Sequence, residues 1–243
     1  MMPTLLITRP EPDGSAFAQS AVQVLGKELR VVVSPILRIQ PVENLPSLDD
    51  FKTLIFTSRY GVRAYAAQTN RRDIPAYAVG DATAKEASNI GIAVKSASGS
   101  ADDLVSKIIS EHPKSPCLHL HGEHSTGQVA ERLSQAGIQT AGAVLYRQAA
   151  EPLSARAEQL LQGEGVVILP LFSRRSARLF FEYGPITAPL VALAMSDAVA
   201  REIPSSLSGA KMTAMKPDVR SMLNALPEAL KTGKRLEGKN RAQ

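Results

Sequence analysis

Hydrophobic and polar residues follow two alternating patterns along the chain. Short apolar runs predict strands over residues 4–8, 30–34, 53–57, 76–79, 117–121, 139–147, 166–169 and 190–194. The stretches between them place apolar residues three or four positions apart, which predicts helices over residues 15–25, 61–67, 82–90, 102–109, 127–136, 155–161, 176–183 and 197–203. This alternation predicts an α/β fold with parallel, flavodoxin-like sheets covered by helices on both faces.

The chain also repeats itself. Residues 78–86 (AVGDATAKE) resemble residues 194–202 (AMSDAVARE), and residues 58–63 (SRYGVR) resemble residues 173–178 (SRRSAR), about 115 residues later in both cases. A weaker match pairs residues 5–25 with residues 118–133. Chance similarity between amphipathic strand–helix units is the alternative. Shared polar letters at nearly one offset favour a duplication, and a repeat this long indicates two similar domains.

Two extended segments are candidates for crossings between these domains. Residues 35–41 (PILRIQP) are bracketed by prolines, and residues 144–149 (VLYRQA) lead into a Glu-Pro turn. We therefore predict a discontinuous first domain over residues 1–36 and 149–230, and a second domain over residues 42–143. Residues 37–41 and 144–148 would form a two-stranded linker, and a cleft would lie between the domains.

Composition and charge are those of an ordinary globular protein. The chain has 243 residues, of which 44% are hydrophobic and 21% are charged. Its formal net charge is +5, and most of that positive charge lies in residues 231–243. We interpret this segment as a solvated, disordered tail and not as a nucleic-acid arm, because no aromatic residues are interleaved with the charges for base stacking.

Targeting and redox features point to the cytoplasm. The single cysteine, Cys117, allows no disulfide within the chain, which is typical of a reducing compartment. No apolar run approaches the roughly 20 residues of a membrane span. The N-terminus also lacks the basic and apolar regions of a signal peptide. We expect a cytoplasmic protein with no membrane or nucleic-acid partner.

Standard catalytic motifs are not found in the sequence. There is no glycine-rich dinucleotide fingerprint, phosphate-binding loop or Gly-x-Ser-x-Gly elbow. Cys117 lies in an apolar strand pattern, which favours a buried thiol over a nucleophile. His119, His121 and His124 could hold zinc, but only Cys117 and Glu123 accompany them, so we expect no metal site. His121 is better explained as a residue at the edge of a cleft.

Small polar and basic residues gather where predicted strands end. Ligands of parallel sheets bind beyond these ends, where helix N-termini offer free N–H groups to anions. Arginines add bidentate contacts to carboxylates. The alternative is that the hydroxyls merely cap helices, as Ser58, Ser173 and Ser196 could, with Pro10 in a first helical turn. The candidate residues are Thr8, Arg9, Pro10, Thr57, Ser58, Arg59, Gly80, Asp81, Thr83, Ser173, Arg174, Arg175, Ser196 and Asp197.

The same residues carry a family resemblance. In order along residues 4–217, the motifs read LITRP (6–10), FTS (56–58) with GV (61–62), AVG (78–80) with TA (83–84), the segment 118–123, VLY (144–146), Ser173 with Ala177, AMS (194–196) with VA (199–200), and Ala214 with Pro217. Each motif is weak alone, but the ordered set resembles the uroporphyrinogen-III synthases.

The resemblance implies a cofactor-independent lyase of tetrapyrrole (heme, siroheme, cobalamin) biosynthesis. Its substrate would be hydroxymethylbilane, a linear tetrapyrrole polycarboxylate that loses water, closes and inverts its last ring. The resemblance also implies Tyr146 as the catalytic group, a monomer, and a transient contact with hydroxymethylbilane synthase. It places the substrate on Thr8, Arg9, Pro10, Thr57, Ser58, Arg59, Gly80, Thr83, His121, Gly122, Ser173, Arg174 and Ser196. A non-catalytic, two-lobed anion-binding or sensor module is the alternative.

The sequence departs from the family pattern at three positions. Phe172 stands where a threonine often precedes the serine, so that loop loses a hydroxyl. His121 replaces a common arginine, which would weaken a carboxylate contact at neutral pH. Asp218 follows Pro217 where threonine is frequent. These departures concern individual contacts and not the assignment as a whole.

Overall fold

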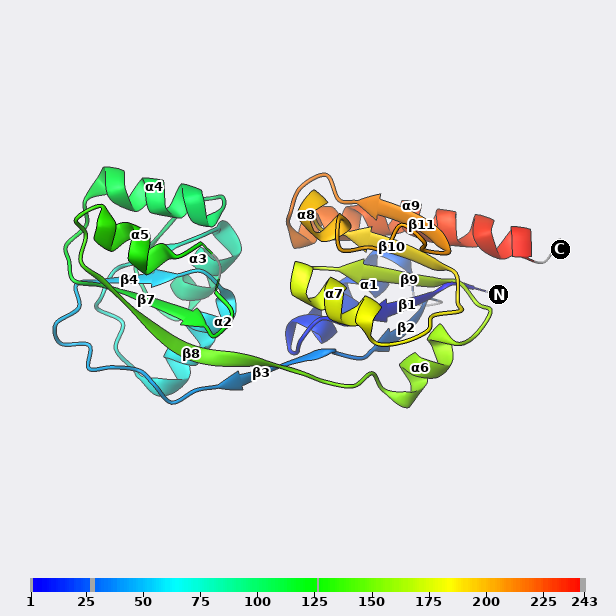
Figure 1. Ribbon diagram of the computed structural model, residues 1–243, viewed down its shortest axis with the longest axis horizontal. Coiled ribbons are helices and arrows are strands. Elements are labelled where there is room, and N and C mark those ends of the chain that lie inside the picture. Colours follow the sequence, from blue (N-terminus) through cyan, green and yellow to red (C-terminus); the bar gives the residue numbers. More distant parts are fainter. Residues whose placement is uncertain (1, 27–28, 126, 241–243) are drawn as a thin grey trace. The chain divides into compact units, whose positions relative to one another are not determined.

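The computed structural model describes residues 2–26, 29–125 and 127–240, and the chain divides into two compact units. Unit 1 comprises Met1–Arg38 and Ala150–Gln243, and unit 2 comprises Ile39–Ala149. The chain passes between the units within strands β3 (Leu37–Pro41) and β8 (Thr140–Ala150). These two strands are neighbours in one sheet, so the connecting segments lie side by side (Figure 1).

Unit 1 is built on a parallel sheet in the order β11-β10-β9-β1-β2. Its strands are β1 (Thr4–Ile7), β2 (Arg30–Val33), β9 (Val167–Leu171), β10 (Leu190–Ala194) and β11 (Gly209–Thr213). Helices α6 (Ala155–Leu161), α7 (Arg174–Glu182) and α8 (Asp197–Ala200) pack on one face of this sheet. Helices α1 (Asp13–Leu25) and α9 (Val219–Asn240) pack on the other face.

Unit 2 is built on a sheet in the order β3-β8-β7-β4-β5-β6, in which the pairs from β8 to β6 are parallel. The further strands are β4 (Thr53–Phe56), β5 (Ala76–Ala78), β6 (Val94–Ser96) and β7 (Cys117–Gly122). Helices α2 (Arg59–Gln68) and α3 (Asp81–Asn89) cover one face. Helices α4 (Ala101–Glu111) and α5 (Val129–Gln135) cover the other face.

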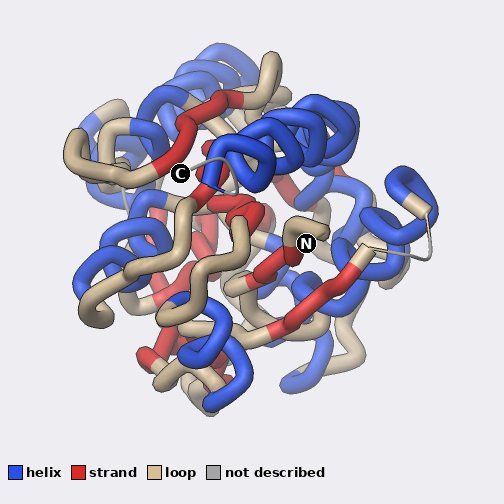
Figure 2. The backbone as a smooth tube through the Cα atoms, turned by 90° about the vertical axis from the view of Figure 1, so that its right-hand side faces the viewer, coloured by secondary structure: helices blue, strands red, loops and turns tan. Residues whose placement is uncertain are grey.

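Each sheet therefore carries an apolar core on both faces. Leu5 and Leu6, successive residues of β1, point into the two different clusters of unit 1 because side chains alternate along a strand. Leu54 and Ile55 do the same in unit 2. Figure 2 shows the strands in red with the helices around them. The predicted α/β class with helices on both sheet faces is confirmed.

The two units share one topology. The path β4-α2-β5-α3-β6-α4-β7-α5-β8 in unit 2 corresponds to β9-α7-β10-α8-β11-α9 followed by β1-α1-β2 in unit 1. The order of the five strands in unit 1 then coincides with that of β6-β5-β4-β7-β8 in unit 2, with the N-terminal strands β1 and β2 in the places of β7 and β8. An ion pair also recurs: Arg63 binds Glu86 at 2.7 Å, and Arg178 binds Glu202 at 3.4 Å. The repeat read from the sequence is thus a structural duplication.

The C-terminal segment corrects an expectation. Residues 231–240 are not a disordered tail, because they continue helix α9. Buried Met222, Leu226 and Ala229 recur at helical spacing, and Gly233 continues the stripe against Pro3 and Val166. Lys231, Lys234 and Arg235 are exposed, so their charges do not oppose the packing of the helix. Residues 241–243 lie outside the described part of the chain.

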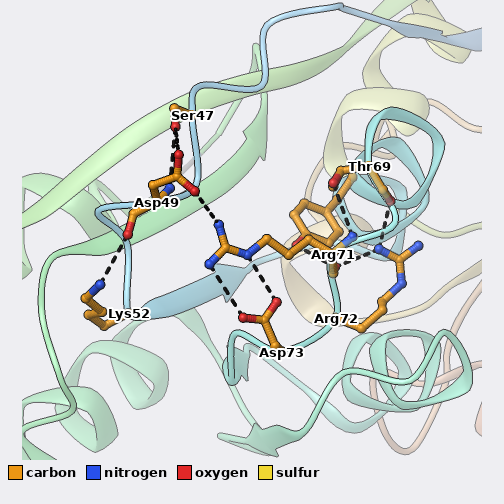
Figure 3. Close-up of polar contacts among 8 residues, drawn as sticks. Ser47, Asp49, Lys52, Thr69, Arg71, Arg72 and Asp73 are labelled. Atoms are coloured by element: carbon orange, nitrogen blue, oxygen red, sulfur yellow. Dashed lines mark hydrogen bonds and ion pairs between the residues drawn. The ribbon is translucent and has the colours of Figure 1, made fainter.

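Polar contacts fasten loops at the amino-end edge of the unit 2 sheet. Arg71 donates to Asp49 at 2.9 Å and to Asp73 at 3.1 Å, which connects the segment before β4 with the segment before β5 (Figure 3). Lys52 donates to the backbone carbonyl of Asp49, and the phenol of Tyr65 donates to the backbone carbonyl of Arg71. The candidate site residues follow the strands and so lie at the opposite, carboxyl-end edge.

Candidate active site

The turn from β4 into α2 places two hydroxyls at the carboxyl edge of unit 2. β4 ends at Phe56, and Ser58 takes extended backbone angles that allow its side chain to accept a 3.1 Å hydrogen bond from Tyr60 N. Ser58 is therefore the N-cap of α2, as the sequence suggested. Thr57 precedes the cap, so capping does not use its hydroxyl, and Arg59 begins the helix.

Tyr146 reaches the same edge because of a β-bulge. His121 pairs with Val144, but Gly122 pairs with Tyr146, so Leu145 is an extra residue in β8. An extra residue breaks the strict alternation of faces. As a result Leu145 and Tyr146, although adjacent, both belong to the same buried cluster. The ring of Tyr146 lies 5.9 Å from that of Tyr60 between centroids.

Tyr146 is a neutral phenol at ordinary pH. Its side chain is buried, with the residue 6% exposed, and burial raises its pKa above 10, while a hydrogen bond with Ser58 acts in the opposite direction. A protonated phenol retains its O–H and can donate a hydrogen bond or a proton. The arrangement thus supplies one neutral donor beside the N-cap of α2.

Strand β7 carries two histidines, of which His119 is buried and His121 is half-buried. His119 is 2% exposed, and its Nε2 lies 3.1 Å from Thr57 Oγ1. Its ring lies 4.6 Å from that of His121, whose Nδ1 donates to the carbonyl of Gly122 at 2.9 Å. Burial lowers the pKa of His119 to about 3, with a smaller effect from His121, so the ring is neutral.

The turn from β5 into α3 completes the unit 2 edge. Gly80 is the N-cap of α3 in extended conformation, and open space surrounds the position its β-carbon would take. Thr83 is buried in the first turn. Asp81 accepts hydrogen bonds from Ser96 and Ser98, which lower its pKa. Because β7, β4 and β5 are adjacent, the residues following them lie at one edge of one sheet.

Unit 1 brings Thr8 and Arg9 to its own carboxyl edge. Arg9 donates to Asp13 at 3.1 Å and stacks on the ring of Phe172, 4.4 Å from its centroid. Thr8 is buried, with 2% exposure. Pro10 does not lie in the first helical turn as expected, because α1 begins at Asp13 and Pro12 takes the N-cap position. Phe172, which lacks the family hydroxyl, thus gives Arg9 an aromatic platform instead.

The neighbouring strands β9 and β10 contribute the serines of unit 1. Ser173 caps α7 by accepting from Ser176 N at 3.1 Å. Ser196 holds the N-cap position of α8 without a side-chain cap bond. Arg174 is exposed and donates to Glu202 at 2.8 Å, and that contact helps lower the pKa of Glu202. The predicted residues of each unit therefore meet at the carboxyl edge of that unit's sheet.

Sequence reasoning missed several partners of these residues. It weighed His119 only as a metal ligand, whereas the structure places it behind Thr57. It did not connect Arg9 with Asp13, although an i,i+4 spacing at a helix start was a usable signal. The ion pairs of Glu86 with Arg63 and of Glu202 with Arg178 were not predicted either, although both partners recur in the repeat.

Two searches of the described residues bear on the class of protein. Among them, no group of three or more His, Cys, Asp or Glu side chains is arranged to hold a metal ion. No described helix combines the length and apolar character needed to cross a membrane. Cys117 is buried with a raised pKa, as expected of a structural thiol.

The fold and the edge residues define a duplicated α/β protein whose helix N-termini, hydroxyls and arginines suit an anionic ligand. The fold is similar to the crystal structure of uroporphyrinogen-III synthetase from Helicobacter pylori 26695, with a TM-score of 0.65 and 18% identity over 94% of this chain and 99% of that one. It is also similar to a mutant uroporphyrinogen III synthase from the bacterium Thermus thermophilus, with a TM-score of 0.56 and 14% identity over 94% and 99% of the two chains.

Family membership follows from the sequence match. The family model described as Uroporphyrinogen-III synthase HemD covers residues 19–224, which is most of the chain. This chain therefore belongs to the uroporphyrinogen-III synthase family, and the resemblance noted in its motifs is confirmed. No curated protein matches it in sequence.

Proposed function

We propose that this protein converts hydroxymethylbilane into uroporphyrinogen III, with loss of water and inversion of the terminal pyrrole ring. The observation that carries the proposal is the family match over residues 19–224. The reaction is that of a cyclising lyase. It needs a site that folds a flexible polyanion and helps a hydroxyl group to leave, and the edge residues have the chemistry for both tasks.

Tyr146 is the proposed donor to the departing hydroxyl. Its phenol is neutral and buried, and it lies beside the N-cap of α2. A neutral O–H can hydrogen-bond or protonate a leaving oxygen, and positioned donors of this kind typically contribute about 10²–10⁴ to a rate. The tilted ring of Tyr60 packs beside it and restricts its orientation.

The carboxylates of the substrate are proposed to bind at the strand ends of both units. Helix N-termini at Ser58, Gly80 and Ser173 supply N–H groups with a favourable dipole. Arg9 adds a charge that Asp13 and Phe172 hold in place. We expect one substrate to bind at these edges, together with Thr8, Pro10, Thr57, Arg59, Thr83, His121, Gly122, Arg174 and Ser196.

The proposed mechanism requires no cofactor. The pyrrole nitrogens of the substrate can themselves expel the terminal hydroxyl, so the protein needs mainly to position the chain and stabilise charge. It must also prevent the simple closure that gives isomer I. We further propose that the protein is a cytoplasmic monomer that receives its reactive substrate in a transient contact with hydroxymethylbilane synthase.

An isomer assay tests the function directly. Porphobilinogen and its deaminase are supplied with and without this protein, and the resulting porphyrin isomers are separated after oxidation. Isomer III should dominate only when the folded protein is present. A product that stays isomer I would exclude the synthase activity and leave the anion-binding module as the better interpretation.

A further inference from the structure

A buried histidine holds the hydroxyl of Thr57. Thr57 is half-buried at the carboxyl edge, while His119 is almost fully buried in β7 behind it. Their Oγ1 and Nε2 atoms lie 3.1 Å apart, within hydrogen-bond distance. Because Ser58 caps α2, the Thr57 hydroxyl is fixed by the histidine and not by the helix.

The protonation state of His119 decides what Thr57 can do. A neutral imidazole carries one N–H, either on Nε2 or on Nδ1. If Nε2 carries the proton, it donates to Thr57 Oγ1, and the threonine proton is free to point to a ligand. If Nδ1 carries it, Thr57 must donate to Nε2, and only its lone pairs then face the edge. Only the first tautomer makes Thr57 a donor to an anion.

The duplicated unit offers an internal comparison. Phe172 occupies the position equivalent to Thr57, since each directly precedes the N-cap serine after the central strand. By sheet register, Ile7 occupies the position equivalent to His119. Phe172 and Ile7 belong to one apolar cluster. The polar pair of unit 2 is thus replaced as a pair in unit 1, which indicates that the two residues act together.

We propose that His119 is a positioning residue which, as the Nε2–H tautomer, holds the Thr57 hydroxyl as a hydrogen-bond donor to a substrate carboxylate. The role rests on the proposed function, because it assigns Thr57 to that substrate. It differs from metal binding or proton transfer, since His119 stays neutral and does not touch the ligand. His121, stacked on the ring, belongs to the edge itself.

A double-mutant cycle in the isomer assay tests this role. Thr57→Val removes the hydrogen bond to a substrate carboxylate and should raise KM about tenfold, with a smaller effect on kcat. His119→Phe removes the group that orients the Thr57 hydroxyl and should raise KM to a similar extent. The double variant should have the KM of either single variant, since both act through one hydroxyl. His119→Gln can again donate to Thr57 and should recover most of the loss.

A matched control lies on the same strand. Thr53 is also buried, but its hydroxyl donates to the carbonyl of Lys114 at the other end of β4. Thr53→Val should lower the free energy of unfolding and leave KM unchanged. Single-variant effects on KM that multiply in the double variant would overturn the proposal, and so would an unchanged KM in His119→Phe.

Nitrogen NMR of the unmodified protein decides the question if a variant does not fold. The Nε2 resonance of His119 should have the shift of a protonated nitrogen and the Nδ1 resonance that of an unprotonated one. The opposite assignment would overturn the proposal. If the unmodified protein yields only isomer I, the proposed function itself fails. If the protein makes isomer III but the effects of the Thr57 and His119 substitutions are independent, only the proposed role of His119 fails.

Discussion

A β-carbon placed on Gly122 would lie 2.5 Å from Cζ and 2.8 Å from the phenol oxygen of Tyr146. Such distances are far below van der Waals contact, so only glycine allows the ring to occupy this place. Tyr146 comes to face Gly122 because of the bulge at Leu145. A glycine in one strand and a bulge in the next therefore act together to position the candidate catalytic phenol.

Gly122→Ala should displace the phenol and lower turnover. The added methyl group would contact the ring of Tyr146 and not a flexible side-chain end, so the ring or strand β8 must move. A shift of about 1 Å in a reacting group can cost about a hundredfold in rate. The measurement is kcat for isomer III, with thermal unfolding recorded in parallel.

Gly238→Ala is the control for this substitution. Gly238 lies on helix α9, and in the described part of the chain no atom comes within 4 Å of its β-carbon position, so alanine there should leave kcat unchanged. If Gly122→Ala keeps full turnover, the precise position of Tyr146 does not matter for the reaction.

Tyr146→Phe should lower kcat by one to two orders of magnitude and change KM little. The substitution keeps the ring contact with Tyr60 and removes only the hydroxyl that would assist the leaving group. Tyr65→Phe is a suitable comparison, because its phenol donates to the carbonyl of Arg71 at the other edge of the sheet. Equal rates for the two variants would remove Tyr146 from the chemistry.

Much of the fold could be predicted from the sequence because the central strands are buried on both faces. Residues 5–7, 54–56 and 190–194 are continuous apolar runs, and β1, β4 and β10 lie there. Strands β6 and β11 were not predicted. They are edge strands with alternating exposure and few apolar residues. They form because their backbones pair with the neighbouring strand, and no local sequence pattern marks them.

The sequence could predict which strand ends contribute residues to the site, but not the contacts between those residues. The repeat and the turn residues indicated Ser58 and Ser173 because helix caps have local sequence preferences. The contact of His119 with Thr57 joins residues far apart in the chain, which periodicity alone does not reveal. The bulge that aligns Tyr146 with Gly122 is equally invisible, because an extra strand residue has no composition of its own.

His119 should make the protein sensitive to mild acid. Its pKa is about 3 in the folded protein, against an ordinary value of 6.5 for a solvated histidine, so below pH 6.5 the unfolded chain binds a proton that the folded chain does not. The free energy of unfolding should therefore fall between pH 6.5 and 3, by at most about 1.4 kcal/mol per pH unit, and be unaffected above pH 6.5.

Urea unfolding at several pH values checks this dependence. His119→Gln removes the titrating group and should flatten the curve between about pH 6.5 and about pH 5. Carboxylates such as Glu111, whose pKa is lowered to about 2 by Lys95, Tyr77 and Lys107, add their own loss only below about pH 4.5. Parallel curves for the variant and the unmodified protein between about pH 5 and about pH 6.5 would mean that His119 takes up a proton equally in the folded and the unfolded states, which would contradict the prediction.

The last turns of helix α9 should contribute to stability, although the sequence suggested a solvated, disordered tail. Glu237 accepts a 2.8 Å hydrogen bond from the backbone N–H of Val166, a buried residue beside the start of β9. Glu237→Ala removes that acceptor and should lower the free energy of unfolding by about 1–3 kcal/mol, because a buried donor loses its partner.

Glu228→Ala is the matched control on the same helix. Its carboxylate is 55% exposed and meets Lys231 and Arg235 only at 3.8 and 4.0 Å, so its loss should cost less than about 1 kcal/mol. Equal urea midpoints for the two variants would show that the turn of α9 around Glu237 does not contribute to the free energy of unfolding.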